Sequence, residues 1–244
     1  MSAVQSPVAS FSGLANLTPR RLGIVRALVF GLALVPLLVL AQRILTGGLG
    51  ANPVEAILRF LGTWTLVLLL VTLGVTPLRW LTGWNWLVRL RRMLGLYAAF
   101  YATLHITAFV WLDHWFDLAA ITADVAKRPY LTLGFFAYLL MIPLVLTSTN
   151  AMVRRLGGRN WQRLHRLVYL IGILGVAHYW FHKIAKNDFV PPAQYAAVLA
   201  LLLGARVFHA WSARRDLARR SAGAQGRIDS PANSSAIVSR RRTS

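Results

Sequence analysis

The chain lacks cysteine altogether, and it is poor in acidic residues, with 7 Asp and Glu among its 244 residues. Without sulfur ligands it cannot form a disulfide, an iron–sulfur cluster, a thiolate zinc site or a covalent c-type haem link. Any redox centre must therefore be held non-covalently, and histidine is the residue suited to hold it. The apolar run after the polar N-terminus also lacks a small-residue cleavage site followed by a soluble domain, so we expect no cleaved signal peptide.

The composition is that of a membrane protein. Hydrophobic residues make up 57% of the chain and charged residues 14%, with a mean hydropathy of +0.54, values that soluble domains of this length seldom combine. The formal net charge of +20 does not indicate a nucleic-acid surface, because the basic residues form short clusters between apolar runs instead of lining one polar face. The charge pattern therefore reports membrane topology.

Six long uncharged runs predict six transmembrane helices in an all-α bundle. A helix needs about 20 residues to cross the hydrocarbon core, so the shorter runs must borrow flanking residues whose arginines snorkel. Two runs contain an internal proline, Pro36 and Pro143, which neighbouring helices can accommodate. The expected spans are Ala27–Gln42, Phe60–Leu78, Met93–Leu112, Pro129–Val153, Leu167–His182 and Phe189–Ala205.

The basic residues are unequally divided between the two sides of these spans. One set of alternate loops and the C-terminal tail hold 21 of the 27 Lys and Arg residues, while the other set holds five of the seven acids. The positive-inside rule then places both termini in the cytoplasm, and we expect a multi-pass protein of a bacterial inner membrane. We expect a flexible tail over residues 1–20, a transmembrane domain over 21–212 and a disordered basic tail over 213–244.

Three of the six histidines lie within or at the edge of expected spans: His105, His165 and His178. A polar ring inside the bilayer is costly, so each is a candidate functional residue, although a histidine that only bonds a neighbouring helix is the plain alternative. His105 lies 13 residues past Arg92, and His178 lies 13 residues past His165. Because both spans run in the same direction and 13 residues rise about 20 Å, His105 and His178 share an outer level.

Two imidazoles facing each other at one level suit a haem with both axial positions filled, whose chemistry is electron transfer because no position is open for oxygen. The inner level pairs His165 with Arg92 instead of with a second histidine. An arginine stays protonated and is no ordinary iron ligand. It suits a haem propionate, a flavin phosphate or a lipid headgroup.

A spacing of 13 residues also leaves His165 and His178 roughly 140° apart on an ideal helix, so a straight helix cannot present both rings to one partner.

No GxGxxG or GxxxxGK[ST] motif is present, so the chain has no evident nucleotide-binding domain of its own. Electrons then have to arrive from a flavin, a quinol or a separate soluble reductase.

Four long stretches resemble the MsrQ family, also called YedZ. They run from Arg91 to His105, Lys127 to Phe135, Leu146 to Leu170 and Ala177 to Trp180, and the likeness covers roughly residues 20–212. The resemblance implies a ferric-reductase-like six-helix domain, related to the membrane part of NADPH oxidases, with haem-associated histidines at His105, His165 and His178. Those oxidases carry two histidines on each of two helices, whereas Arg92 stands at the fourth of these positions here. The resemblance therefore leaves the number of b-type haems, one or two, undetermined.

The resemblance also implies partners. They are a periplasmic molybdopterin subunit, MsrP, which reduces methionine sulfoxide in envelope proteins, and a donor that is the quinone pool or a cytoplasmic flavin reductase, with FMN as an associated cofactor. The chain itself would be the electron-transfer subunit, with sulfoxide reduction on its partner. Two alternatives stay open: a stand-alone ferric or quinone reductase, and a haem-free scaffold or transporter. The absence of Asp, Glu and Lys deep in any span weakens the transporter.

Overall fold

The computed structural model of the chain describes residues 17–184 and 187–228. These residues form α2 (Pro19–Leu45), α3 (Pro53–Thr82), α4 (Val88–Ala108), α5 (Leu118–Lys127), α6 (Pro129–Leu146), α7 (Asn150–Leu156), α8 (Gly158–His165), α9 (Leu167–Ile184) and α10 (Val190–Ile228), with a short 3₁₀ turn, η2 (Asn85–Leu87), and a π-helical turn, η3 (Phe109–Asp113). Six helical segments in the described part are long and apolar enough to span a membrane, which confirms the predicted all-α, six-span fold.

The chain divides into two compact units, the first ending at Leu202 and the second comprising residues 203–244. The first unit contains α2 to α9 and the beginning of α10. The helical part of the second unit runs from residue 203 to Ile228, past residue 212, where the sequence suggested that the membrane domain ends. The rest of the expected basic tail, 229–244, and most of the expected N-terminal tail lie outside the described residues.

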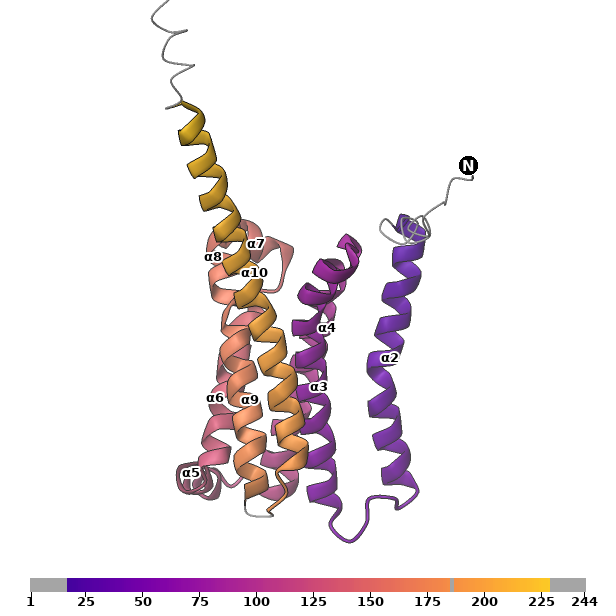
Figure 1. Cartoon of the computed structure of the whole chain (residues 1–244). Helices are drawn as coiled ribbons and strands as arrows, with labels where there is room; N and C mark the ends of the chain where they lie inside the picture. Colours follow the sequence, from indigo (N-terminus) through magenta and orange to yellow (C-terminus); the bar gives the residue numbers. More distant parts are fainter. Residues whose placement is uncertain (1–16, 185–186, 229–244) are drawn as a thin grey trace, which may run out of the picture. The chain divides into compact units, whose positions relative to one another are not determined.

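Two helix pairs make the most extensive contacts in the first unit: α3 with α4, and α6 with α9 (Figure 1). Because the surroundings of a membrane helix are as apolar as its own side chains, such pairing depends on close packing and on bonds between helices. Ala98, Ala99 and Ala102 are buried on α4 and allow a close approach, while Gly95 faces Thr72 of α3. The small residues on α4 therefore serve helix packing.

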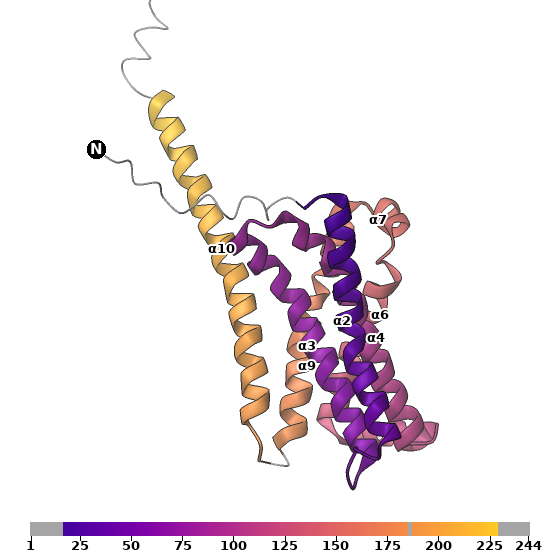
Figure 2. The same cartoon turned by 90° about the vertical axis from the view of Figure 1, so that its right-hand side faces the viewer.

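Helix α2 lies beside α4 (Figure 2), and two tyrosine hydroxyl groups of α4 bond its backbone. Tyr101, which is fully buried, donates a hydrogen bond to the carbonyl of Ala33 at 2.8 Å, and Tyr97 donates to the carbonyl of Phe30 at 3.2 Å. Both acceptors lie within two turns of Pro36, which interrupts the α2 ladder because it has no N–H group. A neighbouring helix thus bonds the α2 backbone close to its proline.

The predicted fourth span, Pro129–Val153, is wrong at its end, because α6 stops at Leu146. The Thr147 and Ser148 hydroxyls each donate at 2.6 Å to carbonyls of the last α6 turn. Thr149 then caps a new helix by accepting a bond from the Met152 N–H at 3.2 Å. Hydroxyl groups compete with the helical ladder at such positions, and a charge-free run does not reveal this.

The predicted fifth span, Leu167–His182, lies within α9, which continues to Ile184. A break just before it separates α9 from α8, which ends at His165, with a turn at Arg166. His165 and His178 therefore lie on two different helices, so the angle of roughly 140° expected on one straight helix does not describe them.

Candidate functional site

His105 on α4 and His178 on α9 face each other inside the bundle. Their ring centres are 6.2 Å apart and the ring planes are inclined by 78°. Both side chains are partly buried. The structure thus brings together the two histidines that the sequence placed at one depth.

Each ring is oriented by a backbone carbonyl of the neighbouring helix. Nδ1 of His105 lies 3.0 Å from the Leu58 oxygen on α3, and Nδ1 of His178 lies 2.6 Å from the Tyr130 oxygen on α6. A carbonyl oxygen only accepts, so Nδ1 carries the proton in both rings and Nε2 is left with a free lone pair. That tautomer is the one that ligates a metal through Nε2, with the Nδ1–H bond setting the ring orientation.

A glycine lies against each ring, one helical turn after the carbonyl that orients it. A Cβ atom built on Gly62 of α3 would lie 3.1 Å from Cε1 of His105, and one built on Gly134 of α6 would lie 2.8 Å from Nδ1 of His178. Leu58 and Gly62 therefore repeat on α3 what Tyr130 and Gly134 provide on α6. We call each set, a carbonyl and the glycine four residues later, an imidazole seat.

These features fit a bis-imidazole haem. Two imidazoles that ligate one iron from opposite faces, with Fe–N bonds of about 2 Å, have ring centres roughly 6 Å apart. The tautomers and the two seats meet the remaining requirements, an unprotonated Nε2 on each ring and a fixed ring direction. Within residues 17–184 and 187–228 no group of three or more His, Asp or Glu side chains forms a metal cluster, and a haem with two axial histidines needs none.

His165 is the last residue of α8 and does not belong to the His105–His178 pair. Its ring stacks on Trp161 with centres 3.9 Å apart, and its Nδ1 donates to the Trp161 carbonyl at 3.1 Å. Nε2 is buried and makes no hydrogen bond of normal geometry to a described residue, although the Leu144 carbonyl lies near the ring. Such an atom costs free energy unless a ligand satisfies it.

Arg92 contacts the start of α7. Its guanidinium donates to Oδ1 of Asn150, the first residue of α7, at 2.7 Å. The adjacent Arg91 instead reaches the Thr76 hydroxyl of α3 at 3.4 Å. Depth alone cannot distinguish adjacent residues, whose side chains point about 100° apart on a helix.

The acidic residues around α5 take part in local bonds. Nε2 of His114 lies 3.1 Å from Asp124, which also pairs with Arg128 at 3.5 Å. Asp117 caps α5 by accepting bonds from two backbone N–H groups at 2.9 and 3.0 Å. Figure 1 shows α5 lying across the bundle end. These groups hold the connection between α4 and α6, so they are not an evident ligand site.

Sequence reasoning did not find Gly62, Gly134 or the two carbonyl acceptors. The sequence indicates the two glycines weakly: each is an isolated Gly inside a Leu-rich or Phe-rich helix, where glycine lowers helix stability and is usually retained for close packing. The sequence does not indicate the two carbonyl acceptors, because every residue carries a backbone carbonyl.

Comparison with known proteins agrees with this geometry. Residues 61–176 match the family model described as ferric reductase like transmembrane component. A relative from Ralstonia nicotianae, named protein-methionine-sulfoxide reductase heme-binding subunit MsrQ, is 58% identical over 199 residues, covering 82% of this chain and 92% of its own length. Relatives of the same name from Herminiimonas arsenicoxydans and Bordetella pertussis are 54% and 52% identical, over 81% and 84% of this chain and 90% and 98% of their own lengths. The chain belongs to the MsrQ family.

Proposed function

We propose that this chain carries electrons across the bacterial inner membrane to a periplasmic molybdopterin enzyme, MsrP, that repairs methionine sulfoxide in envelope proteins. The observation that carries the proposal is the pair of opposed imidazoles, His105 and His178, each set in its own seat. The names of the relatives, heme-binding subunits of a methionine-sulfoxide reductase, supply the kind of cofactor and the kind of reaction.

His105 and His178 would hold a b-type haem between their rings. Such a haem supplies a one-electron carrier with no open coordination position. The protein contributes ring orientation, through the Leu58 and Tyr130 carbonyls, and a low-polarity enclosure, through the apolar core of α3, α4, α6 and α9. The sulfoxide chemistry then belongs to the partner enzyme, and this chain is its electron-transfer subunit.

His165 and Arg92 are assigned to a second cofactor near the opposite end of the bundle. The orphaned Nε2 of His165 suits a metal or a donor group, and Arg92 suits an anionic group such as a propionate or a flavin phosphate. This arrangement is compatible with a second haem or with FMN. Electrons would enter there from a cytoplasmic flavin reductase or the quinol pool, with both termini cytoplasmic as the charge distribution predicts.

The test is an optical spectrum of the purified full-length protein in detergent, oxidised and then reduced with dithionite, with haem per chain from pyridine haemochrome. A sharp low-spin b-type spectrum supports bis-histidine ligation, and the haem ratio distinguishes one haem from two. Full haem content in both His105→Ala and His178→Ala would disprove the ligand assignment. Electron delivery is then tested by mixing dithionite-reduced protein with MsrP and a methionine sulfoxide substrate; no reoxidation would exclude the proposed acceptor.

A further inference from the structure

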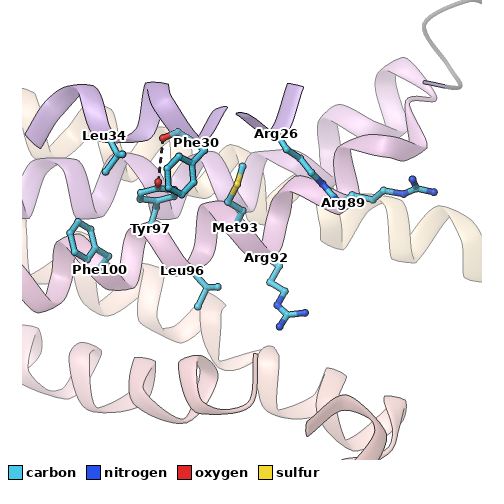
Figure 3. Close-up of a pocket in the computed structure, with 9 residues that line it drawn as sticks. All are labelled: Arg26, Phe30, Leu34, Arg89, Arg92, Met93, Leu96, Tyr97 and Phe100. Carbon is cyan, nitrogen blue, oxygen red and sulfur yellow. Dashed lines mark hydrogen bonds between the residues drawn. The ribbon is translucent and has the colours of Figure 1, made fainter. Parts of the chain in front are cut away.

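An open groove of about 530 Å³ lies between α2 and α4, away from the histidine pair (Figure 3). Three arginines line it: Arg26 from α2, and Arg89 and Arg92 from the first turns of α4. The rest of its lining is apolar or aromatic and includes Phe30 and Phe100, whose side chains are 53% and 40% exposed. A ligand for this groove has to combine an anionic group with an apolar body.

The groove runs along the helix axis. Arg89 and Phe100 are eleven residues apart on α4, a rise of about 16 Å, so the cationic end and the apolar end are separated by most of the length of an acyl chain. The aromatic side chains are exposed on a transmembrane segment, where the neighbouring solvent is lipid. The groove is thus open to the bilayer along its length and charged at one end.

The charges in the groove are uncompensated by acidic side chains. None of its lining residues is Asp or Glu, and none of its arginines takes part in an ion pair with a described residue. Arg92 reaches a neutral amide, that of Asn150. The guanidinium groups of Arg26 and Arg89 therefore suit a phosphate, because charge-assisted bonds to phosphate are about twice as strong as neutral ones.

The apolar end excludes a ring that carries polar atoms. A flavin or a quinone head placed there would bury carbonyl and N–H groups, each costing about 1–3 kcal/mol if unpaired. Tyr97 is the polar side chain of that end, and its hydroxyl already donates to the Phe30 carbonyl at 3.2 Å. A hydrocarbon chain has no such groups and fits without penalty.

We propose that this groove binds one anionic phospholipid, with its phosphate on Arg26 and Arg89 and an acyl chain along Phe30, Tyr97 and Phe100. The lipid would then join α2 to α4 at one end of the bundle. This lipid site is separate from the proposed electron-transfer function.

The experiment uses native mass spectrometry of the purified full-length protein in detergent, titrated with phosphatidylglycerol or with phosphatidylcholine of the same acyl chains. Inorganic phosphate, glycerol 3-phosphate and FMN are titrated in parallel. The test variant is Arg26→Gln/Arg89→Gln, and the control is Arg20→Gln/Arg21→Gln, which removes the same charge from the first turn of α2 outside the groove. All four positions are exposed, so the substitutions do not disturb the core.

We expect the wild-type protein and the control to bind one phosphatidylglycerol at least about tenfold more tightly than phosphatidylcholine, and the test variant to lose that preference. Equal loss in the control would overturn the proposal, since a diffuse charge effect would then suffice. Binding of glycerol 3-phosphate as tight as that of the lipid would show a phosphate site without a tail. Displacement of the lipid by FMN, with the same arginine dependence, would make the occupant a flavin.

Discussion

Gly134→Ala is the substitution that tests the imidazole seats most directly. The added Cβ would lie 2.8 Å from Nδ1, 3.0 Å from Cε1 and 3.3 Å from Cγ of His178, whereas ordinary contact begins at 3.4 Å. The ring must retreat from α6 by about 0.6 Å, and sites of this kind tolerate about 0.5 Å before function suffers. It cannot do so freely, because its Nδ1 is bonded to the Tyr130 carbonyl on the same helix.

The expected loss follows from two terms. Overpacking of a close-packed region costs about 1–3 kcal/mol, and weakening the Nδ1–H bond costs about 0.5–1.5 kcal/mol. Together they amount to about 1.5–4.5 kcal/mol, or roughly a 12- to 1,600-fold weaker hold on a ligand that needs His178 in place. Gly62→Ala should be milder, since its Cβ would approach the His105 ring only to 3.1 Å and a shift of a few tenths of an ångström relieves it.

The assay is haem per chain by pyridine haemochrome, with the reduced spectrum, on wild type, Gly134→Ala, Gly62→Ala and Gly31→Ala. Gly31 is the matched control, because a Cβ there meets nothing within 4 Å and alanine favours the helix by up to about 1 kcal/mol. We expect haem content to fall in the order Gly31→Ala, Gly62→Ala, Gly134→Ala. A monodisperse Gly134→Ala protein with full haem and an unchanged spectrum would refute the seat argument.

Three further predictions concern the remaining parts of the site and the topology. His105→Ala and His178→Ala should each abolish the low-spin signal of their shared haem, while His209→Ala, measured by the same reduced spectrum, should retain it. Arg92→Gln should change the redox potential of a cofactor at His165 more than Arg89→Gln does, because the Arg92 guanidinium is the one assigned to an anionic group of that cofactor; an equal or larger shift with Arg89→Gln in a potentiometric titration would contradict that assignment. Because the chain has no cysteine, Thr122→Cys and Ser221→Cys are single labelling sites, and a membrane-impermeant maleimide applied to spheroplasts should label Thr122→Cys alone.

The spans and the depth of the histidines could be read from the sequence because both depend on distance along a helix. Charge-free runs located the six spans, and a spacing of 13 residues placed His105 level with His178. The helix breaks at Thr147–Thr149 and at Arg166 were not predicted, because they depend on hydroxyl groups and on local turns that a hydropathy pattern does not register.

The direction of each side chain also escaped the sequence reasoning. Arg91 and Arg92 have the same depth within one residue, yet one reaches Thr76 of α3 and the other bonds Asn150. Gly62 and Gly134 could be noticed as isolated helical glycines, but their function appears only when the neighbouring helix brings an imidazole against them. Which side chains meet depends on how each helix is rotated about its axis relative to its neighbour, and the periodicity of the sequence does not determine that rotation.

The two imidazole seats are completed at different times as the chain is made. Helices α3 and α4 are consecutive spans, so the Leu58 carbonyl and Gly62 can receive His105 once that hairpin has inserted. The second seat joins α6 to α9, which are separated by α7 and α8, so His178 reaches Tyr130 and Gly134 only after the fifth span has been synthesised. A ligand that requires both rings therefore binds late in biogenesis. A chain truncated before α9 would contain His105 and its seat but would lack His178, the second ring of the site.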